Sequence, residues 1–227
     1  MSTAIQAVIS DFGGVLTTPL LQAFAAMDAH NAIDRGAMGR ALARVAERDG
    51  AHPLFELECG RMTEADFLGR LSAALEEDLG RPVPMQSFAE RYFAELRPNH
   101  EMLAFLAALR DSGLRLALLT NNVREWEPRW RAMLPVDELF EVVVDSAFVG
   151  MRKPDPAIYE LTCARLGVEP AACLFVDDNE PNCAAARALG MTAVWFRDTA
   201  QAIADMRGAL GGADAGDQFS EPSRSQR

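Results

Sequence analysis

Four short segments of the chain carry residue types that could do chemistry on an anionic substrate. They supply a carboxylate after an apolar run, a hydroxyl beside an amide, a lone ammonium group and a pair of carboxylates: Asp11, Thr120 with Asn121, Lys153, and Asp177 with Asp178. A carboxylate can act as a nucleophile, and paired acids can hold a hard metal ion. Taken singly, each has a plainer interpretation as a turn residue, a strand end or a surface charge. Their joint occurrence beside predicted strands favours a functional site.

The region around Asp11 indicates a strand that opens into a tight turn. The apolar run 7–9 leads through Ser10 to Asp11, and Gly13 and Gly14 follow. Glycine lets the backbone turn sharply and lets a ligand approach the main chain closely. Ligands of open α/β sheets bind at the carboxyl ends of the strands. We therefore expect Asp11 at the mouth of a sheet.

The lysine lies in a loop that prolines stiffen. Lys153 is the only lysine of the chain, which otherwise uses arginine. Pro154 and Pro156 restrict the backbone beside it and precede a predicted helix. This arrangement would hold a cation at the start of that helix.

The elements that must position these groups alternate between helix and strand over the second half of the chain. Apolar runs predict strands at 7–10, 114–119, 141–145, 173–176 and 192–196. Periodic segments predict helices at 101–112, 124–133, 156–166 and 183–189. Because such alternation implies right-handed crossovers, we predict an α/β fold with a doubly wound parallel sheet, a Rossmann-like core covered by helices on both faces.

The segment between the first two predicted strands is helical throughout. Helices are predicted at 21–29, 37–48, 64–79, which starts after Thr63 as its N-cap, and 87–96. We predict an all-helical cap domain at 18–98, inserted into a core formed by 1–17 and 99–210. The cap would open and close about hinges at 16–19 and 97–99. The tail 211–227 is rich in Gly, Ser, Asp and Gln, and we expect it to be disordered.

The composition argues against several classes of partner. The chain has 227 residues, 49% of them hydrophobic, and a net charge of −11, so it offers no basic stripe for nucleic acid. It lacks an apolar run of about 18 residues, the length that spans a membrane. Its first residues lack the features of a secretory signal, and its four cysteines form no CxxC pair. We expect a cytoplasmic protein, with its oligomeric state left open.

In their order along the chain, the four segments resemble the motifs of the haloacid dehalogenase-like (HAD) hydrolase superfamily. Those motifs are an Asp after the first strand, a Thr or Ser after the second, a Lys before a later helix and an acidic pair after the fourth strand. The resemblance covers residues 5–197 and is most specific at 152–159 and 175–179. The helical insert resembles the first cap class. Within it, 58–63 followed by Phe67 is similar to the branch that includes the phosphatase domain of soluble epoxide hydrolases and glucose-1-phosphate phosphatases.

The resemblance implies a magnesium-dependent phosphatase that acts on a small phosphorylated metabolite. Asp11 would attack phosphorus and form an aspartyl-phosphate, which water then hydrolyses. The residues implied to hold the phosphoryl group are Thr120, Asn121 and Lys153. The groups implied to hold Mg²⁺ are Asp11, the backbone carbonyl of Gly13, and Asp178, with Asp177 close by.

The chain departs from this pattern at Gly13. Phosphatases of the superfamily usually carry there a second Asp, which acts as general acid and base, and such assistance is typically worth about 10² to 10⁴ in rate. A sugar 1-phosphate or an acyl phosphate leaves more easily and would tolerate its loss. As a hypothesis, Glu58, Arg61 or a water molecule takes part of that role.

Two other functions remain open, a carbon–halogen hydrolase and a non-catalytic module, and phosphonate cleavage is excluded. A carbon–halogen hydrolase would use the same Asp11, but dehalogenases of the superfamily need no metal and lack the acidic pair found here at 177–178. A non-catalytic binding or regulatory module would explain Gly13, yet it leaves the other matched residues without a reason. Phosphonate cleavage uses a cap lysine, and the span 19–99 contains none.

Overall fold

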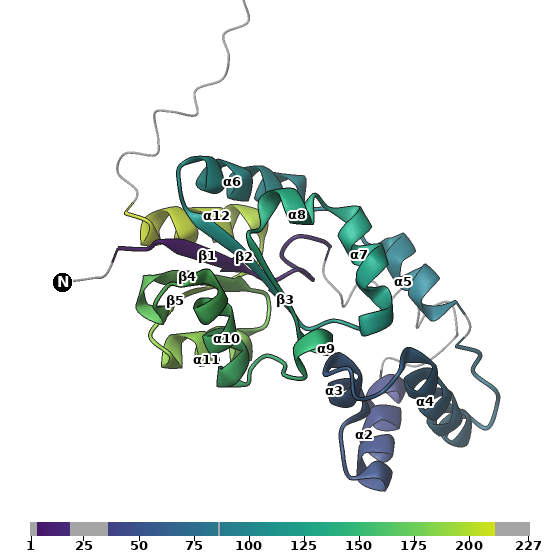
Figure 1. The fold of residues 1–227 in the computed structure, drawn as a ribbon. Helices are drawn as coiled ribbons and strands as arrows, with labels where there is room; N and C mark the ends of the chain where they lie inside the picture. Colours follow the sequence, from purple (N-terminus) through teal and green to yellow (C-terminus); the bar gives the residue numbers. More distant parts are fainter. Residues whose placement is uncertain (1–3, 19–35, 86, 212–227) are drawn as a thin grey trace, which may run out of the picture.

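The core of the protein is a parallel sheet of five strands. The computed structural model describes residues 4–18, 36–85 and 87–211, so the predicted helix 21–29 and the predicted disorder of 212–227 lie outside the described residues. The strands are β1 Ala7–Ser10, β2 Arg115–Thr120, β3 Val142–Asp145, β4 Cys173–Asp177 and β5 Thr192–Trp195. They are all parallel and lie in the order β3-β2-β1-β4-β5 (Figure 1). The predicted doubly wound sheet is confirmed.

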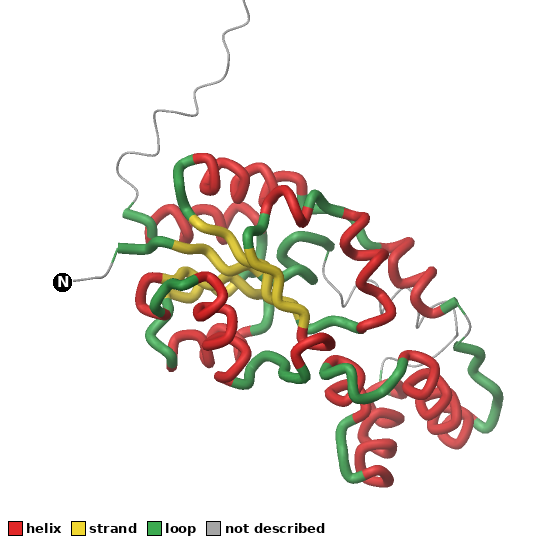
Figure 2. The backbone as a smooth tube through the Cα atoms, in the orientation of Figure 1, coloured by secondary structure: helices red, strands yellow, loops and turns green. Residues whose placement is uncertain are grey.

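Helices cover both faces of the sheet, as Figure 2 shows. One face packs against α10 Pro156–Leu166 and α11 Glu180–Ala188, and the other packs against α6 His100–Asp111 and α12 Thr199–Ala209. Successive side chains of a strand point to opposite faces. In β1, Ala7 and Ile9 therefore lie in the apolar cluster under α10, while Val8 lies in the cluster under α6. This two-sided burial explains why β1 reads as a continuous apolar run.

The described part of the insert between β1 and β2 consists of helices joined by loops. Its helices, which we call the cap helices, are α2 Ala37–Asp49, α3 Pro53–Glu58, α4 Glu64–Leu79 and α5 Phe88–Glu95. The side chain of Thr63 caps α4 as predicted, accepting a hydrogen bond from the amide of Asp66 at 3.1 Å. Figure 1 shows α2, α3 and α4 grouped beyond α9 (Ser146–Val149), the short helix that follows β3.

The two segments predicted as hinges lie side by side where they are described. Thr17 and Pro98 form an isolated antiparallel bridge, and the amide of Asn99 donates to the carbonyl of Leu16 at 2.8 Å. The chain therefore enters and leaves the insert through one paired connection. Motion about this connection stays a prediction.

Some elements of the structure differ from those that the sequence predicts. The short helices α3 and α8 (Val136–Leu139), together with α9 and α12, were not predicted. The predicted helix 124–133 is two elements, a 3-10 turn η1 at Arg124–Trp126 and then α7 at Glu127–Met133, whose second residue is a proline. Among the described residues, no helix combines the length and hydropathy needed to cross a membrane.

Candidate active site

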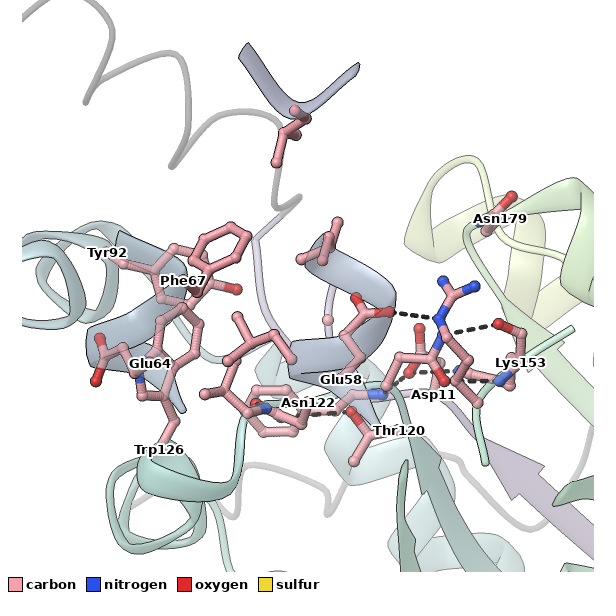
Figure 3. Close-up of a pocket in the computed structure, with 18 of the residues that line it drawn as sticks. Asp11, Glu58, Glu64, Phe67, Tyr92, Thr120, Asn122, Trp126, Lys153 and Asn179 are labelled. Atoms are coloured by element: carbon pink, nitrogen blue, oxygen red, sulfur yellow. Dashed lines mark hydrogen bonds and ion pairs between the residues drawn. The ribbon is translucent and has the colours of Figure 1, made fainter. Parts of the chain in front are cut away.

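Three of the predicted site residues come together because their strands are neighbours. Asp11 follows β1, Thr120 ends β2 and Asp177 ends β4, and β1 lies between the other two strands. The amide of Asp11 donates to the carbonyl of Val176 at 2.9 Å, which ties the end of β1 to the end of β4. Lys153 reaches the same edge from the loop before α10. Figure 3 shows Asp11, Thr120 and Lys153 gathered at one end of a cavity.

Lys153 is the centre of the charge network. Its side chain is 1% exposed, and its Nζ lies 2.7 Å from Asp11 Oδ1 and 2.6 Å from Asp177 Oδ2. Nζ also donates to the carbonyl of Leu119 at 2.8 Å. Burial acts to lower the pKa of Lys153, but the two carboxylates outweigh it, and the net shift is upward. The lysine is therefore a buried, fully partnered cation.

Asp11 has one oxygen that is fixed and one that is not. Oδ1 accepts hydrogen bonds from the amide of Phe12 at 2.7 Å and from Lys153, whereas no donor among the described residues reaches Oδ2. Burial raises the pKa of Asp11 to about 8, although Lys153 opposes this shift. A further positive charge would favour the ionised form that a nucleophile needs.

Both carboxylate oxygens of Asp177 have partners, and one of these partners is Lys153. Its Oδ1 accepts from the amide of Asn179 at 2.8 Å and from Asn182 Nδ2 at 3.0 Å, and its Oδ2 accepts from Lys153. Asn182, in the first turn of α11, therefore holds the carboxylate of Asp177, a partnership that was not predicted from the sequence. Its spacing of five residues from Asp177 is the signal that could have identified it. The role of Asp177 as a direct metal ligand stays a prediction.

Asp178 lies against a glycine of the loop that follows β1. A Cβ placed on Gly14 would lie 2.0 Å from Asp178 Oδ2, and the φ of Gly14 is +78°. Only glycine therefore allows this close approach. Burial, and then the charge of Asp177, raise the pKa of Asp178 to about 6.

The three carboxylates form a compact acidic group. Asp11, Asp177 and Asp178 each offer an oxygen, and these oxygens lie within 4.8 Å of one another. Lys153 is the only cation paired with them among the described residues, so three acids face one base. Hard oxygen ligands with excess negative charge suit Mg²⁺. The donor set therefore fits the predicted metal, and Gly13 lines the same cavity.

Thr120 and Asn121 differ in how they are placed. Thr120 is 1% exposed and lines the cavity, with Asn122 Nδ2 3.4 Å from its hydroxyl. Asn121 pairs with the backbone of Lys153 through both ends of its amide, donating to the carbonyl at 3.0 Å and accepting from the amide at 2.8 Å. Asn121 thus positions the lysine loop, and its direct contact with a phosphoryl group stays a prediction.

Of the two cap residues considered for proton transfer, Glu58 lines the cavity and Arg61 does not. Glu58 Oε2 lies 2.6 Å from Arg152 Nε, next to Lys153 in the core. Burial raises the pKa of Glu58, while Arg152 opposes the shift. Arg61 instead pairs with Glu56 at 2.8 Å and donates to the carbonyl of Gly150 at 3.2 Å. Arg61 therefore joins the cap to the core outside the site.

The cavity above these groups has a volume of about 860 Å³. Polar groups form one end, and apolar side chains of the cap helices form much of the remaining wall. A concave, mostly apolar site with a few convergent charges is the usual form of a small-molecule site. The arrangement can hold an anionic group beside a carboxylate nucleophile.

The comparison with known families identifies the class. The family model described as "Hydrolase: haloacid dehalogenase-like hydrolase" matches residues 5–190. The chain belongs to the haloacid dehalogenase-like hydrolases, and the resemblance found in the motifs is confirmed.

Curated relatives match this chain over part of their own length. It is 28% identical over 209 residues to mouse acyl-CoA dehydrogenase family member 10, covering 91% of this chain and 19% of the relative. It is 26% identical over 217 residues to pig bifunctional epoxide hydrolase 2, covering 92% of this chain and 39% of the relative. It is 38% identical over 126 residues to a phosphoserine phosphatase of Thermus thermophilus, covering 54% of this chain and 51% of the relative. The chain thus spans about a fifth to a half of the length of these relatives.

Solved structures share the fold. A HAD family enzyme of Bacteroides thetaiotaomicron, in complex with magnesium and inorganic phosphate, is 21% identical with a TM-score of 0.58, covering 84% of this chain and 93% of that chain. The L-2-haloacid dehalogenase RSc1362 is 22% identical with a TM-score of 0.66, covering 92% and 100%. At these identities the likeness concerns the fold alone, and function must be argued from the site.

Proposed function

We propose that the protein is a magnesium-dependent phosphatase that hydrolyses a small organic phosphate monoester through an aspartyl-phosphate on Asp11. The observation that carries the proposal is Asp11 itself, buried at the cavity floor with Oδ1 held by Lys153 at 2.7 Å and with the carboxylate of Asp178 beside it. Curated phosphatases among the relatives support the same class.

The chain's own residues account for both chemical steps. In the first, an oxygen of Asp11 bonds to phosphorus while the bond from phosphorus to the ester oxygen breaks, and the leaving alkoxide takes a proton from Glu58 or from water. In the second, water attacks phosphorus, the bond to Asp11 breaks, and inorganic phosphate forms. Lys153 and the hydroxyl of Thr120 would hold the phosphoryl oxygens, which offsets repulsion between the carboxylate and the dianion.

Magnesium fits the donor set at the end of the sheet. Asp11, Asp178 and the backbone carbonyl of Gly13 would hold it, while Asp177 keeps Lys153 in place. When bound, the ion would supply the positive charge that neutralises the phosphoryl group.

The absence of an acid at Gly13 leaves the protonation of the leaving group to another group. Of the two described cap carboxylates that line the cavity, Glu58 lies near Asp11 and Glu64 lies at the far end (Figure 3). Glu58 therefore remains the candidate, whereas Arg61 is engaged elsewhere. If Glu58 takes part, Glu58→Gln will slow esters of poor leaving groups more than p-nitrophenyl phosphate. An equal effect on both esters would assign Glu58 to holding Arg152 only.

The direct test is phosphate release from a panel of phosphate monoesters with and without magnesium, using Asp11→Asn as the blank. The proposal predicts turnover that requires magnesium and disappears in Asp11→Asn. Fluoride or chloride release from 2-haloacids without phosphate release would establish the dehalogenase alternative instead. A lack of any turnover above the blank would favour a binding module. A cytoplasmic location stays a prediction.

A further inference from the structure

We infer that the organic part of the substrate is a long hydrocarbon chain that lies in the apolar part of the cavity, so that the protein hydrolyses phosphate monoesters of apolar alcohols. This inference rests on the proposed phosphatase function and narrows it to a substrate class. The evidence comes from the cavity wall, from its aromatic end, from its charges and from its size.

The wall is built from every cap helix. Apolar side chains reach it from α2, α3, α4 and α5, among them Leu42, Leu54, Leu68 and Phe88. Leu42, Leu54 and Leu68 are only partly buried, so they keep exposed surface. Covering such surface with an apolar ligand removes it from water, which favours binding by roughly 25 cal/mol per Å².

The far end of the cavity is aromatic and held in shape by stacking. Trp126 of η1 lies 4.8 Å from Tyr92 and 6.1 Å from Phe88, measured between ring centroids, and both pairs are stacked. Figure 3 shows Phe67, Tyr92 and Trp126 together at the end of the cavity opposite Asp11 and Lys153. Glu64 lies beside these rings, whereas Asp11 and Lys153 lie at the other end, so the rings stand away from the position of the phosphate.

The charges argue against a second anionic group on the substrate. Among the described residues that line the cavity, the cations are Arg152 and Lys153, and each already has a carboxylate partner. Glu58 and Glu64 add negative charge to the same wall. A nucleotide, a bisphosphate or a phosphorylated acid would bring a further anion that no free cation meets. The described part of the wall therefore accommodates one phosphate at the polar end and offers no free cation to a second anion.

The size of the cavity exceeds what a phosphate group alone needs. A volume of about 860 Å³ equals that of roughly 30 water molecules at ~30 Å³ each. Cavities of this size enclose ligands as large as a typical drug molecule. The remaining space suits an extended chain of many carbons.

The test measures kcat/KM of the 227-residue protein with magnesium. It compares straight-chain alkyl phosphates, from butyl to dodecyl phosphate, with a sugar phosphate. We expect kcat/KM to rise about fourfold per added methylene until the cavity is filled, the equivalent of ~0.8 kcal/mol each. The gain should lie mainly in KM, because a chain contact far from phosphorus is equally present before and during the reaction. Constant or falling kcat/KM with chain length, or a preference for the sugar phosphate, would overturn the inference.

A matched pair of variants tests whether the hydrocarbon chain of the substrate lies in the cavity. Leu68 and Leu79 are both partly buried leucines of α4, but only Leu68 lines the cavity. Leu68→Asn should lower the ratio of kcat/KM for dodecyl phosphate to kcat/KM for butyl phosphate by about tenfold. This is the low end of the effect of one methylene group in an apolar pocket. Leu79→Asn should leave that ratio unchanged. Equal ratios in the two variants would contradict the placement.

A binding measurement separates failure of this inference from failure of the proposed function. Titration calorimetry with dodecyl and butyl phosphonate should show tighter binding and a more negative heat-capacity change for the longer chain, the mark of buried apolar surface. If Asp11-dependent phosphate release occurs without any preference for chain length, the phosphatase function stands and the substrate class is wrong. If no ester is hydrolysed yet dodecyl phosphonate binds more tightly, the catalytic proposal fails alone.

Discussion

Gly14→Ala is the substitution that most sharply tests how the metal-binding end of the site is assembled. The added Cβ would lie 2.0 Å from Asp178 Oδ2 and 2.5 Å from its Cγ, and real Cβ contacts essentially never fall below 3.0 Å. The carboxylate of Asp178 must therefore move by about 1 Å or more. Its side chain is short, so this movement displaces the whole carboxylate from the acidic group.

The expected loss follows from that displacement. A misplacement of ~1 Å can cost about 10²-fold in rate, so kcat should fall by that order. Affinity for magnesium, measured by calorimetry, should fall with it, because Asp178 is a proposed ligand. The positive φ of +78° adds a stability loss, roughly 1–2 kcal/mol in the free energy of unfolding for a non-glycine residue.

Gly50→Ala is the matched control. Gly50 ends α2 with a φ of +73°, and a Cβ there would meet nothing within 4 Å. It should lose similar stability while keeping kcat and magnesium affinity. Asp178→Asn provides a second variant that removes the negative charge of the ligand without backbone strain and should match the loss in Gly14→Ala. A folded Gly14→Ala protein with parental kcat and magnesium affinity would refute the reasoning.

Three further predictions concern the supports of the site. Asn121→Ala removes two hydrogen bonds to the backbone of Lys153 and should lower the free energy of unfolding by about 1–3 kcal/mol in urea titrations, together with kcat. Gly60→Ala should raise KM and lower the melting temperature, because its Cβ would lie 2.2 Å from the carbonyl of Ala147 and push the cap loop off α9. Asp145 is buried, which raises its pKa to about 6, so its ionised form destabilises the fold as pH rises from about 4 to above 6. Asp145→Asn should therefore be more stable than the parent by up to roughly 3 kcal/mol above about pH 6 and by little near pH 4, in urea titrations across that range. Unchanged stability in any of the three variants would contradict its stated cause.

The order of motifs predicted the sheet and its carboxyl-end site because both depend on local patterns. An apolar run followed by an acid marks β1 and Asp11, and similar runs mark β2 and β4. Parallel strands end at one edge, so residues distant in sequence, such as Asp11 and Asp177, meet without any pairwise signal.

The side-chain partnerships could not be predicted in the same way. The pairing of Asn121 with Lys153, and of Glu58 with Arg152, joins residues that are far apart in sequence. The helix α3 has only six residues, too short for a periodic pattern to identify. The contacts of the cap with the core depend on tertiary packing, which a single sequence does not specify.

The most direct test of the central claim is to find the phosphoryl group on Asp11. Acid quenching during turnover of a phosphate monoester with magnesium, followed by proteolysis and mass spectrometry, should show one phosphoryl group on the peptide that contains Asp11 and on no other. Sodium borohydride reduction of the quenched protein should convert Asp11 to homoserine and mark the site. Steady phosphate release with the phosphoryl group on another residue, or undiminished release by Asp11→Asn, would contradict the account.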